Sequence, residues 1–234
     1  DVTHQVQPWQ LFLRNEMRSG RMPFWDPYQF SGTPFWGNGS GAPLFPLHLL
    51  FVTLPLQIGL VLLPWLRIVI GGLGVWYLAR EIGLKERGAM LASLVFPLSG
   101  LPMVWLLVPM ANAVALAPWW LCSVVRISNG KGSWRLLGLV AGLQLLAGHP
   151  ETVIHTAMVS GIYLLVRGSD NSFGAWKNFI LGWLLGGALS AVQTVPLLFT
   201  VFESSKWLYE GGAQAVQPPY YQIAAQVFRI VLPG

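Results

Sequence analysis

A small group of polar residues interrupts the apolar sequence in the second half of the chain. His149, Pro150, Glu151 and His155 lie in the stretch LLAGHPETVIH, between two runs that are typical of apolar helices. Carboxylate and imidazole groups transfer protons and bind polar substrates. Because Glu151 and His155 are four positions apart, a helix places both side chains on one face, where they can line one cavity.

Each of these residues also has a structural interpretation. Pro150 suits the first position of a helix, and an acid such as Glu151 in the first turn complements the helix dipole. A buried histidine with its hydrogen bonds satisfied is an equal alternative for His155. Glu151 therefore has two alternative interpretations, helix capping and a functional role.

The composition predicts a membrane protein. Of 234 residues, 54% are hydrophobic and only 10% are charged, whereas soluble domains carry roughly 25% charged residues. Cys122 is the single cysteine, which excludes a disulfide framework and a cysteine metal site. The net charge is +5, but the basic residues form no stripe along one helix, so we expect no nucleic-acid partner.

Six apolar segments follow a polar, aromatic opening. They are residues 56–79, 88–107, 110–126, 134–147, 151–166 and 177–199. About 20 residues are needed to span the hydrocarbon core, so the fourth and fifth segments are short. We predict an all-α polytopic membrane protein with about six transmembrane helices after a long outward-facing amphipathic and aromatic loop.

The expected organisation has three parts. Residues 1–46 form an extracytoplasmic loop, in which Trp9 and Phe12 alternate with charged residues as in an interfacial helix. Residues 47–199 form a transmembrane helical bundle, and residues 200–234 begin another extracytoplasmic loop.

The basic residues orient these segments. They gather in three alternate connections: Arg80, Lys85 and Arg87, then Arg126, Lys131 and Arg135, then Arg167 and Lys177. The positive-inside rule makes these connections cytoplasmic. Residues 1–46, 148–151 and 200–234 are then expected outside.

Several polar residues fall within the apolar segments. Arg67 lies about 11 residues, or roughly 16 Å, from either end of its segment. A charge at that depth usually faces a cavity or a partner, so Arg67 is a candidate for binding a lipid phosphate. The alternative is a helix that begins later and leaves Arg67 near the surface. We expect Asn112, Gln144 and Gln193 to form hydrogen bonds between helices.

Small residues predict close contacts between helices. Gly138 and Gly142 form one G-x-x-x-G pattern, and Gly182 and Gly186 form another. Such patterns let helix backbones approach each other closely. The glycines at 71–74 lie inside an apolar run and are expected to serve the same purpose.

The order of several motifs resembles a known family. The motifs are the opening DVTHQVQPWQLFLRNEMRSGRMPFWDPYQF, then GGLGVWYLAREIGL, FPLSG, ALAPWWL and LQLLAGHPETVIH. Together they resemble the N-terminal part of the YfhO-like bacterial membrane proteins, which are similar to the GT-C superfamily of membrane glycosyltransferases. The resemblance covers nearly the whole chain, and it implies a piece of a longer protein without the family's first helix.

The resemblance implies a function at the outer side of the cell membrane. GT-C enzymes move a sugar from a polyprenyl-phosphate carrier to an acceptor, here a cell-envelope polymer or lipid. They carry a catalytic acid near the start of an outward loop, and Asp1 has the corresponding position. Glu151 then orients this base, binds acceptor hydroxyls or holds a divalent cation with it; no other cofactor is expected.

The remaining candidates would bind substrate. Arg67, His149 and His155 are the residues expected to contact the lipid phosphate and the substrate. Two other functions stay open. A transporter or lipid flippase would use the same buried residues as a pathway, and a noncatalytic membrane assembly partner would use none of them.

Overall fold

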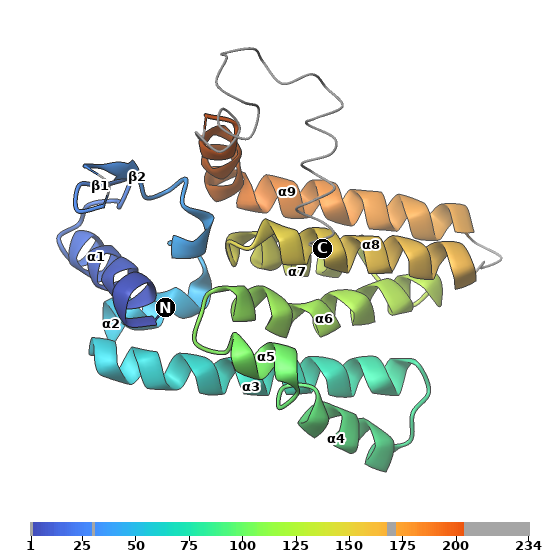
Figure 1. Cartoon of the computed structure of the whole chain (residues 1–234). Helices are drawn as coiled ribbons and strands as arrows, with labels where there is room; N and C mark the ends of the chain where they lie inside the picture. The colour runs from blue at the N-terminus through green and yellow to red at the C-terminus, as the bar shows by residue number, and fades with distance from the viewer. Residues whose placement is uncertain (1, 30, 168–171, 204–234) are drawn as a thin grey trace, which may run out of the picture.

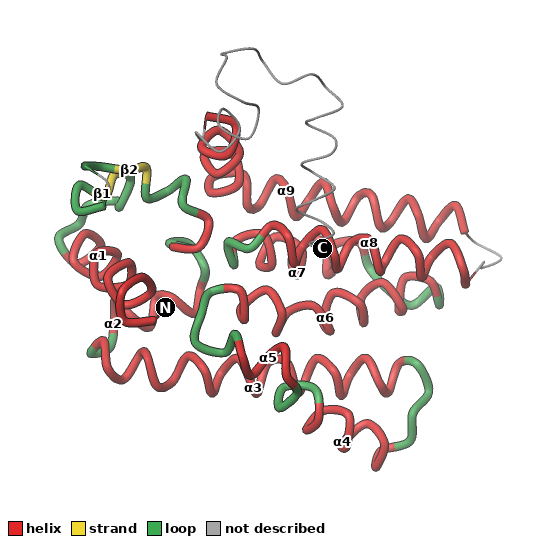
Figure 2. The backbone as a smooth tube through the Cα atoms, viewed as in Figure 1, coloured by secondary structure: helices red, strands yellow, loops and turns green. Residues whose placement is uncertain are grey.

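The structure, a computed structural model, describes residues 2–29, 31–167 and 172–203. This part of the chain is mostly helical (Figure 2). In chain order the elements are η1 (Val2–Val6), α1 (Gln7–Arg18), β1 (Trp25–Asp26), β2 (Thr33–Pro34), η2 (Gly39–Gly41), η3 (Pro46–His48), α2 (Leu49–Thr53), α3 (Leu56–Glu81), α4 (Glu86–Val95), α5 (Gly100–Val104), α6 (Met110–Ser128), α7 (Trp134–Leu146), α8 (Pro150–Arg167) and α9 (Ser172–Glu203).

Four stretches are long and apolar enough to cross a membrane, which is consistent with an all-α membrane protein. They are α3, the stretch Glu86–Val104 that holds α4 and α5, α6, and α9. Each of the six predicted segments contains a helix. However, α7 has only 13 residues, and α8 begins with the polar PETVIHT sequence.

The second apolar segment differs from the continuous helix that its composition predicts. It is split into α4, which ends at Val95, and α5, which begins at Gly100. Pro97 has no N–H to donate to the carbonyl of Ser93, and its ring crowds the preceding turn. The helix therefore ends before Pro97, and a short turn leads into α5.

The predicted close helix contacts at the two G-x-x-x-G patterns are confirmed, and the two patterns pack against each other. A Cβ atom on Gly186 would lie 2.6 Å from the Cβ of Ala141 and 3.0 Å from the backbone nitrogen of Gly142. A Cβ atom on Gly182 would lie 2.7 Å from the Leu137 side chain. Only glycine permits this approach, so α7 lies directly along α9.

The glycines at 71–74 likewise face neighbouring helices. A Cβ atom on Gly72 would lie 2.9 Å from the carbonyl oxygen of Ser93 in α4, and one on Gly74 would lie 2.7 Å from the Trp119 ring in α6. The prediction of helix contact at this motif is confirmed.

The connections between helices alternate between two ends of the bundle (Figure 1). One end holds the α3–α4 turn, the α6–α7 turn, the end of α8 and the start of α9. The eight basic residues of the predicted cytoplasmic connections therefore lie at one end. The first loop, the α7–α8 turn and the end of α9 lie at the other, which we call the loop end. That the loop end faces the outside of the cell stays a prediction.

The predicted interfacial helix is confirmed as a helix, α1, which packs on the rest of the first loop. Trp9, Phe12 and Leu13 form a buried cluster with Phe35. Arg14 and Arg18, one turn apart, donate to carbonyl oxygens at and just beyond the end of α2, those of Phe51, Val52, Thr53 and Leu54. These orphan carbonyls have no partner within their own helix, so the two arginines fix α1 to the start of the bundle.

Candidate functional site

A groove lies between the first loop and the last turns of α9. Its volume is about 780 Å³, within the range of roughly 300–1,000 Å³ that is usual for ligand pockets. The lining residues are His4, Gln5, Trp9, Gln29, Thr33, Pro34, Gly37, Asn38, Gly39, Leu197 and Thr200. Apart from His4, these described residues are amides, hydroxyls, glycines and apolar groups. The lining therefore combines hydrogen-bonding amides and hydroxyls with apolar groups.

A proline in α9 creates one of the bonds that hold the first loop beside this groove. Pro196 has no N–H, so the carbonyl of Val192, four residues earlier, loses its partner within the helix. The indole nitrogen of Trp36 donates to that oxygen at 2.6 Å. The freed carbonyl is thus used to attach the first loop to α9, which bends sharply in its last turns (Figure 2).

Gln193 makes a second attachment and confirms the predicted bonds between helices. Its Nε2 donates to the carbonyl of Leu146 at the end of α7, at 3.0 Å, and its Oε1 accepts from the backbone N–H of Leu44, at 3.3 Å. The side chain is buried. One amide therefore joins α9, α7 and the first loop. Gln144 similarly donates to the carbonyl of Ala113 in α6 and to the hydroxyl of Thr156 in α8.

The GHPE turn lies against the groove wall. Gly148 has a φ of +78°, a left-handed conformation that ends α7, and α8 begins at Pro150, as the sequence predicts. A Cβ atom on Gly39 would lie only 2.8 Å from the carbonyl oxygen of Gly148. Two glycines therefore let the first loop rest directly on this turn.

His149 caps α8. Its Nδ1 accepts from the backbone N–H of Thr152 at 3.3 Å and lies 2.8 Å from the Thr152 hydroxyl. Burial lowers the pKa of His149, while the charge of Glu151 opposes that shift and His155 adds to it. The three candidate residues are thus close enough to interact electrostatically, and neutral His149 has the lone pair that the cap requires.

Glu151 and His155 do not line the groove. Both are half-buried on the first turns of α8, and the position of Glu151 in the first turn fits the interaction with the helix dipole. Asp1, the predicted base, lies outside the described residues. Its approach to Glu151, and a divalent cation held between them, therefore stay predictions; within the described residues, no group of three metal-ligating side chains occurs.

Arg67 is buried in the middle of α3. The helix begins at Leu56 and the Arg67 side chain is buried, so the alternative of a later helix start is wrong. Nε donates to Oδ1 of Asn112 at 2.7 Å, and Nη1 donates to the carbonyl of Leu106 at 2.5 Å. Arg67 does not line the groove; it borders a small cavity of about 10 Å³. Its binding of a lipid phosphate stays a prediction.

Sequence reasoning missed His48. This residue is fully buried in η3, where it joins Asn112 to the first loop. The signal was present, since a single histidine in the apolar run LFPLHLLFV raises the same question as the GHPE turn. Its partners, however, come from distant parts of the chain.

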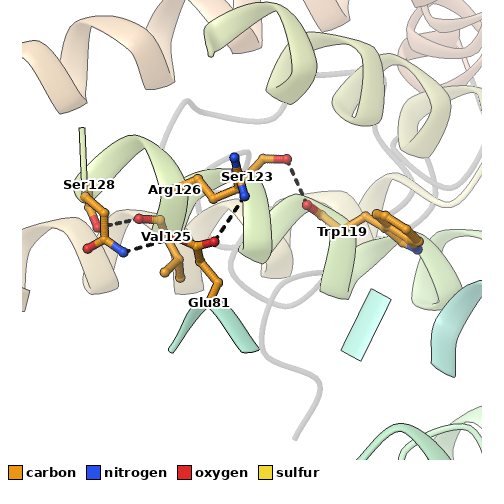
Figure 3. A network of polar contacts seen from close by, with 7 residues as sticks. Glu81, Trp119, Ser123, Val125, Arg126 and Ser128 are labelled. Carbon is orange, nitrogen blue, oxygen red and sulfur yellow. Dashed lines mark hydrogen bonds and ion pairs between the residues drawn. The ribbon is translucent and has the colours of Figure 1, made fainter. Parts of the chain in front are cut away.

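A separate polar network ties the helix ends at the opposite, basic end (Figure 3). Glu81, at the end of α3, accepts from Arg126 at 3.1 Å and from Asn129 at 3.4 Å. Asn129 in turn accepts from Arg167 at 2.9 Å. These bonds join α3, α6 and α8 at the basic end.

Comparisons with known proteins add no relative. No protein-family model, curated protein or solved structure matches this chain.

Proposed function

We propose that the chain is part of a membrane glycosyltransferase that moves a sugar from a polyprenyl-phosphate carrier to a cell-envelope acceptor. The motif order that resembles the YfhO-like proteins is the first support. The second is the groove at the loop end, where the proposal puts the sugar and the acceptor. Its amides and hydroxyls suit polyhydroxyl ligands, and Pro34 and Leu197 add apolar contacts.

The groove is the observation that carries the proposal. Its lining residues belong to the first loop and the last turns of α9, at the end of the bundle without the basic connections. The positive-inside rule assigns that end to the outside. A lipid carrier in the outer leaflet would present its phosphate and sugar at this level. Asp1 precedes the groove residue His4 by three positions in the sequence, which suits its proposed role as the base that deprotonates the acceptor hydroxyl.

Glu151 has the second proposed role. It belongs to the turn that supports the groove wall through Gly148 and Gly39. Because Glu151 does not line the groove, we assign it to orienting the base rather than to contact with the acceptor. His149 and His155 are proposed to steady the departing phosphate, and a divalent cation would serve the same purpose.

Replacement of the proposed base tests this function. In proteoliposomes that contain the full-length protein and a polyprenyl-phosphate sugar donor, Asp1→Asn should abolish sugar transfer while the protein still accumulates. Glu86→Gln, at the exposed start of α4 and at the basic end, is the matched control and should keep full transfer. Normal transfer by Asp1→Asn would contradict the proposal. Lipid movement across the membrane without sugar transfer would favour a flippase instead.

A further inference from the structure

Four buried side chains from four elements touch end to end inside the molecule. They are Arg67 of α3, Asn112 of α6, His48 of η3 and Gln10 of α1, each 3% exposed or less. Arg67 Nε lies 2.7 Å from Asn112 Oδ1, Asn112 Nδ2 lies 3.1 Å from His48 Nε2, and His48 Nδ1 lies 3.3 Å from the carbonyl oxygen of Gly41. This chain of contacts runs from the middle of a membrane helix to the first loop.

The chemistry of Arg67 fixes the direction of every bond in this chain. A guanidinium group only donates, so the Asn112 atom that faces it must be the oxygen. The amide nitrogen of Asn112 then faces His48 and donates to Nε2, which must carry a lone pair. The proton of the neutral imidazole is therefore on Nδ1, from which it is donated to the carbonyl of Gly41.

The contact of Gln10 with His48 is also consistent with a proton on His48 Nδ1. The Gln10 amide lies 3.5 Å from His48 Nδ1. With the amide nitrogen on that side, two donors face each other, and Oε1 is buried without a partner among the described residues. A half-turn of the amide places the oxygen there instead, where it accepts from the same Nδ1–H.

Gly41 links this row of hydrogen-bonded side chains to the groove. It is the last residue of η2, whose first residue, Gly39, lines the groove together with the preceding Gly37 and Asn38. The Arg67 charge has no carboxylate partner among the described residues. The positive charge of Arg67 therefore polarises the hydrogen bonds through Asn112 and His48 and strengthens them, because this interior is poorly solvated.

We propose that Arg67 is a positioning residue that fixes the groove wall through Asn112 and His48. These three residues, which we call the relay, hold Gly41 and with it the wall at 37–39. This role of Arg67 rests on the proposed function in one respect, because it takes the groove to be the substrate site. Arg67 then acts at a distance in place of direct contact with the ligand.

The relay requires neutral His48. Burial and the nearby positive charge of Arg67 lower the pKa of His48 to about 3, and Arg67 is the charged group that faces it from the elements packed around it in the described chain. Neutral Gln10 and Asn112 and the rings of Phe45 and Phe51 complete its surroundings. The relay therefore persists throughout the physiological pH range.

Asn112→Asp removes the hydrogen bond from residue 112 to His48, and low pH should restore a bond between them. The new carboxylate still accepts from Arg67, but it has no proton to donate to His48. His48 can then bridge the carboxylate and the carbonyl of Gly41 only as an imidazolium with both nitrogens protonated. A neighbouring carboxylate raises the pKa of a histidine, so this bridge exists at low pH and is lost as pH rises.

Thiol labelling of the groove wall tests the relay without any assay of sugar transfer. A cysteine replaces Asn38 in full-length protein that carries Cys122→Ala, and its labelling rate is measured from pH 5 to 8. The ratio of the Asn112→Asp rate to the rate with Asn112 intact should be near one at pH 5. It should rise to roughly two- to tenfold at pH 8, the effect of losing one hydrogen bond of about 0.5–1.5 kcal/mol.

Three controls separate the relay from general loosening of the fold. Asn129→Asp makes the same change in the network at the basic end and should leave the ratio at one. His48→Leu should raise labelling equally at every pH, whereas His48→Gln, which keeps a donor and an acceptor, should not. A ratio for Asn112→Asp that does not change with pH, or His48→Leu labelling equal to wild type, would overturn the relay. Either result would leave the sugar-transfer test of Asp1 unaffected.

Discussion

The bond between Trp36 and the proline-freed carbonyl of Val192 gives a sharp prediction about stability. Trp36→Phe keeps a buried ring that can still pack beside Phe24, whose centroid is 5.0 Å away, but it removes the donor that lies 2.6 Å from that oxygen. A buried carbonyl left without a partner costs about 1–3 kcal/mol. We expect Trp36→Phe to lower the free energy of unfolding by about that amount, plus a smaller loss of apolar contact.

A double-mutant cycle isolates the hydrogen bond from the change in ring size. Pro196→Ala returns an N–H to position 196, four residues after Val192, so the helix itself can satisfy the carbonyl. In that background Trp36→Phe should lose only the packing contribution. The two substitutions should therefore couple by about 1–2 kcal/mol, measured as unfolding of the purified full-length protein with increasing SDS in mixed micelles. An equal loss from Trp36→Phe in both backgrounds would refute the idea that Pro196 creates the attachment.

Three further predictions concern other parts of the molecule. Gly186→Ala should destabilise the fold by about 1–3 kcal/mol because its Cβ meets α7, whereas Gly187→Ala, with nothing within 4 Å, should be neutral or stabilising in the same SDS titration. Because the folded-state pKa of His48 is lowered to about 3, the unfolded state binds the proton more readily. Stability should therefore fall by about 1.4 kcal/mol per pH unit as pH drops below roughly 6, and His48→Gln should remove that slope. Glu151→Gln should strongly lower sugar-transfer turnover if Glu151 orients the base, whereas a role in capping alone predicts unchanged turnover and a loss of only about 0.3–1 kcal/mol in stability.

Local signals in the sequence predicted the elements well. Gly148 and Pro150 mark the end of one helix and the start of the next by their own backbone preferences, so the turn at GHPE was predictable. The apolar segments likewise predicted where the helices lie. The break at Pro97 was missed because the overall apolar composition outweighed one proline in that prediction, although the missing N–H is a local property.

The partners of buried polar groups could not be predicted in the same way. The depth of Arg67 in its helix followed from counting residues, but Asn112 is 45 positions away and meets it only because α3 packs beside α6. The Trp36 indole reaches a carbonyl 156 positions away. Such pairs depend on tertiary packing, and so does the groove, whose lining comes from both ends of the described chain.

The most direct measurement is sugar transfer by protein with a filled groove. Asn38→Trp places a large ring in the groove, and Leu98→Trp places the same ring in the apolar groove between α3 and α4. Both full-length variants are reconstituted with a polyprenyl-phosphate sugar donor and compared at equal amounts of folded protein. Asn38→Trp should transfer little or no sugar, whereas Leu98→Trp should transfer sugar at the wild-type rate. Full transfer by Asn38→Trp would contradict the claim that the groove beneath the first loop is the substrate site.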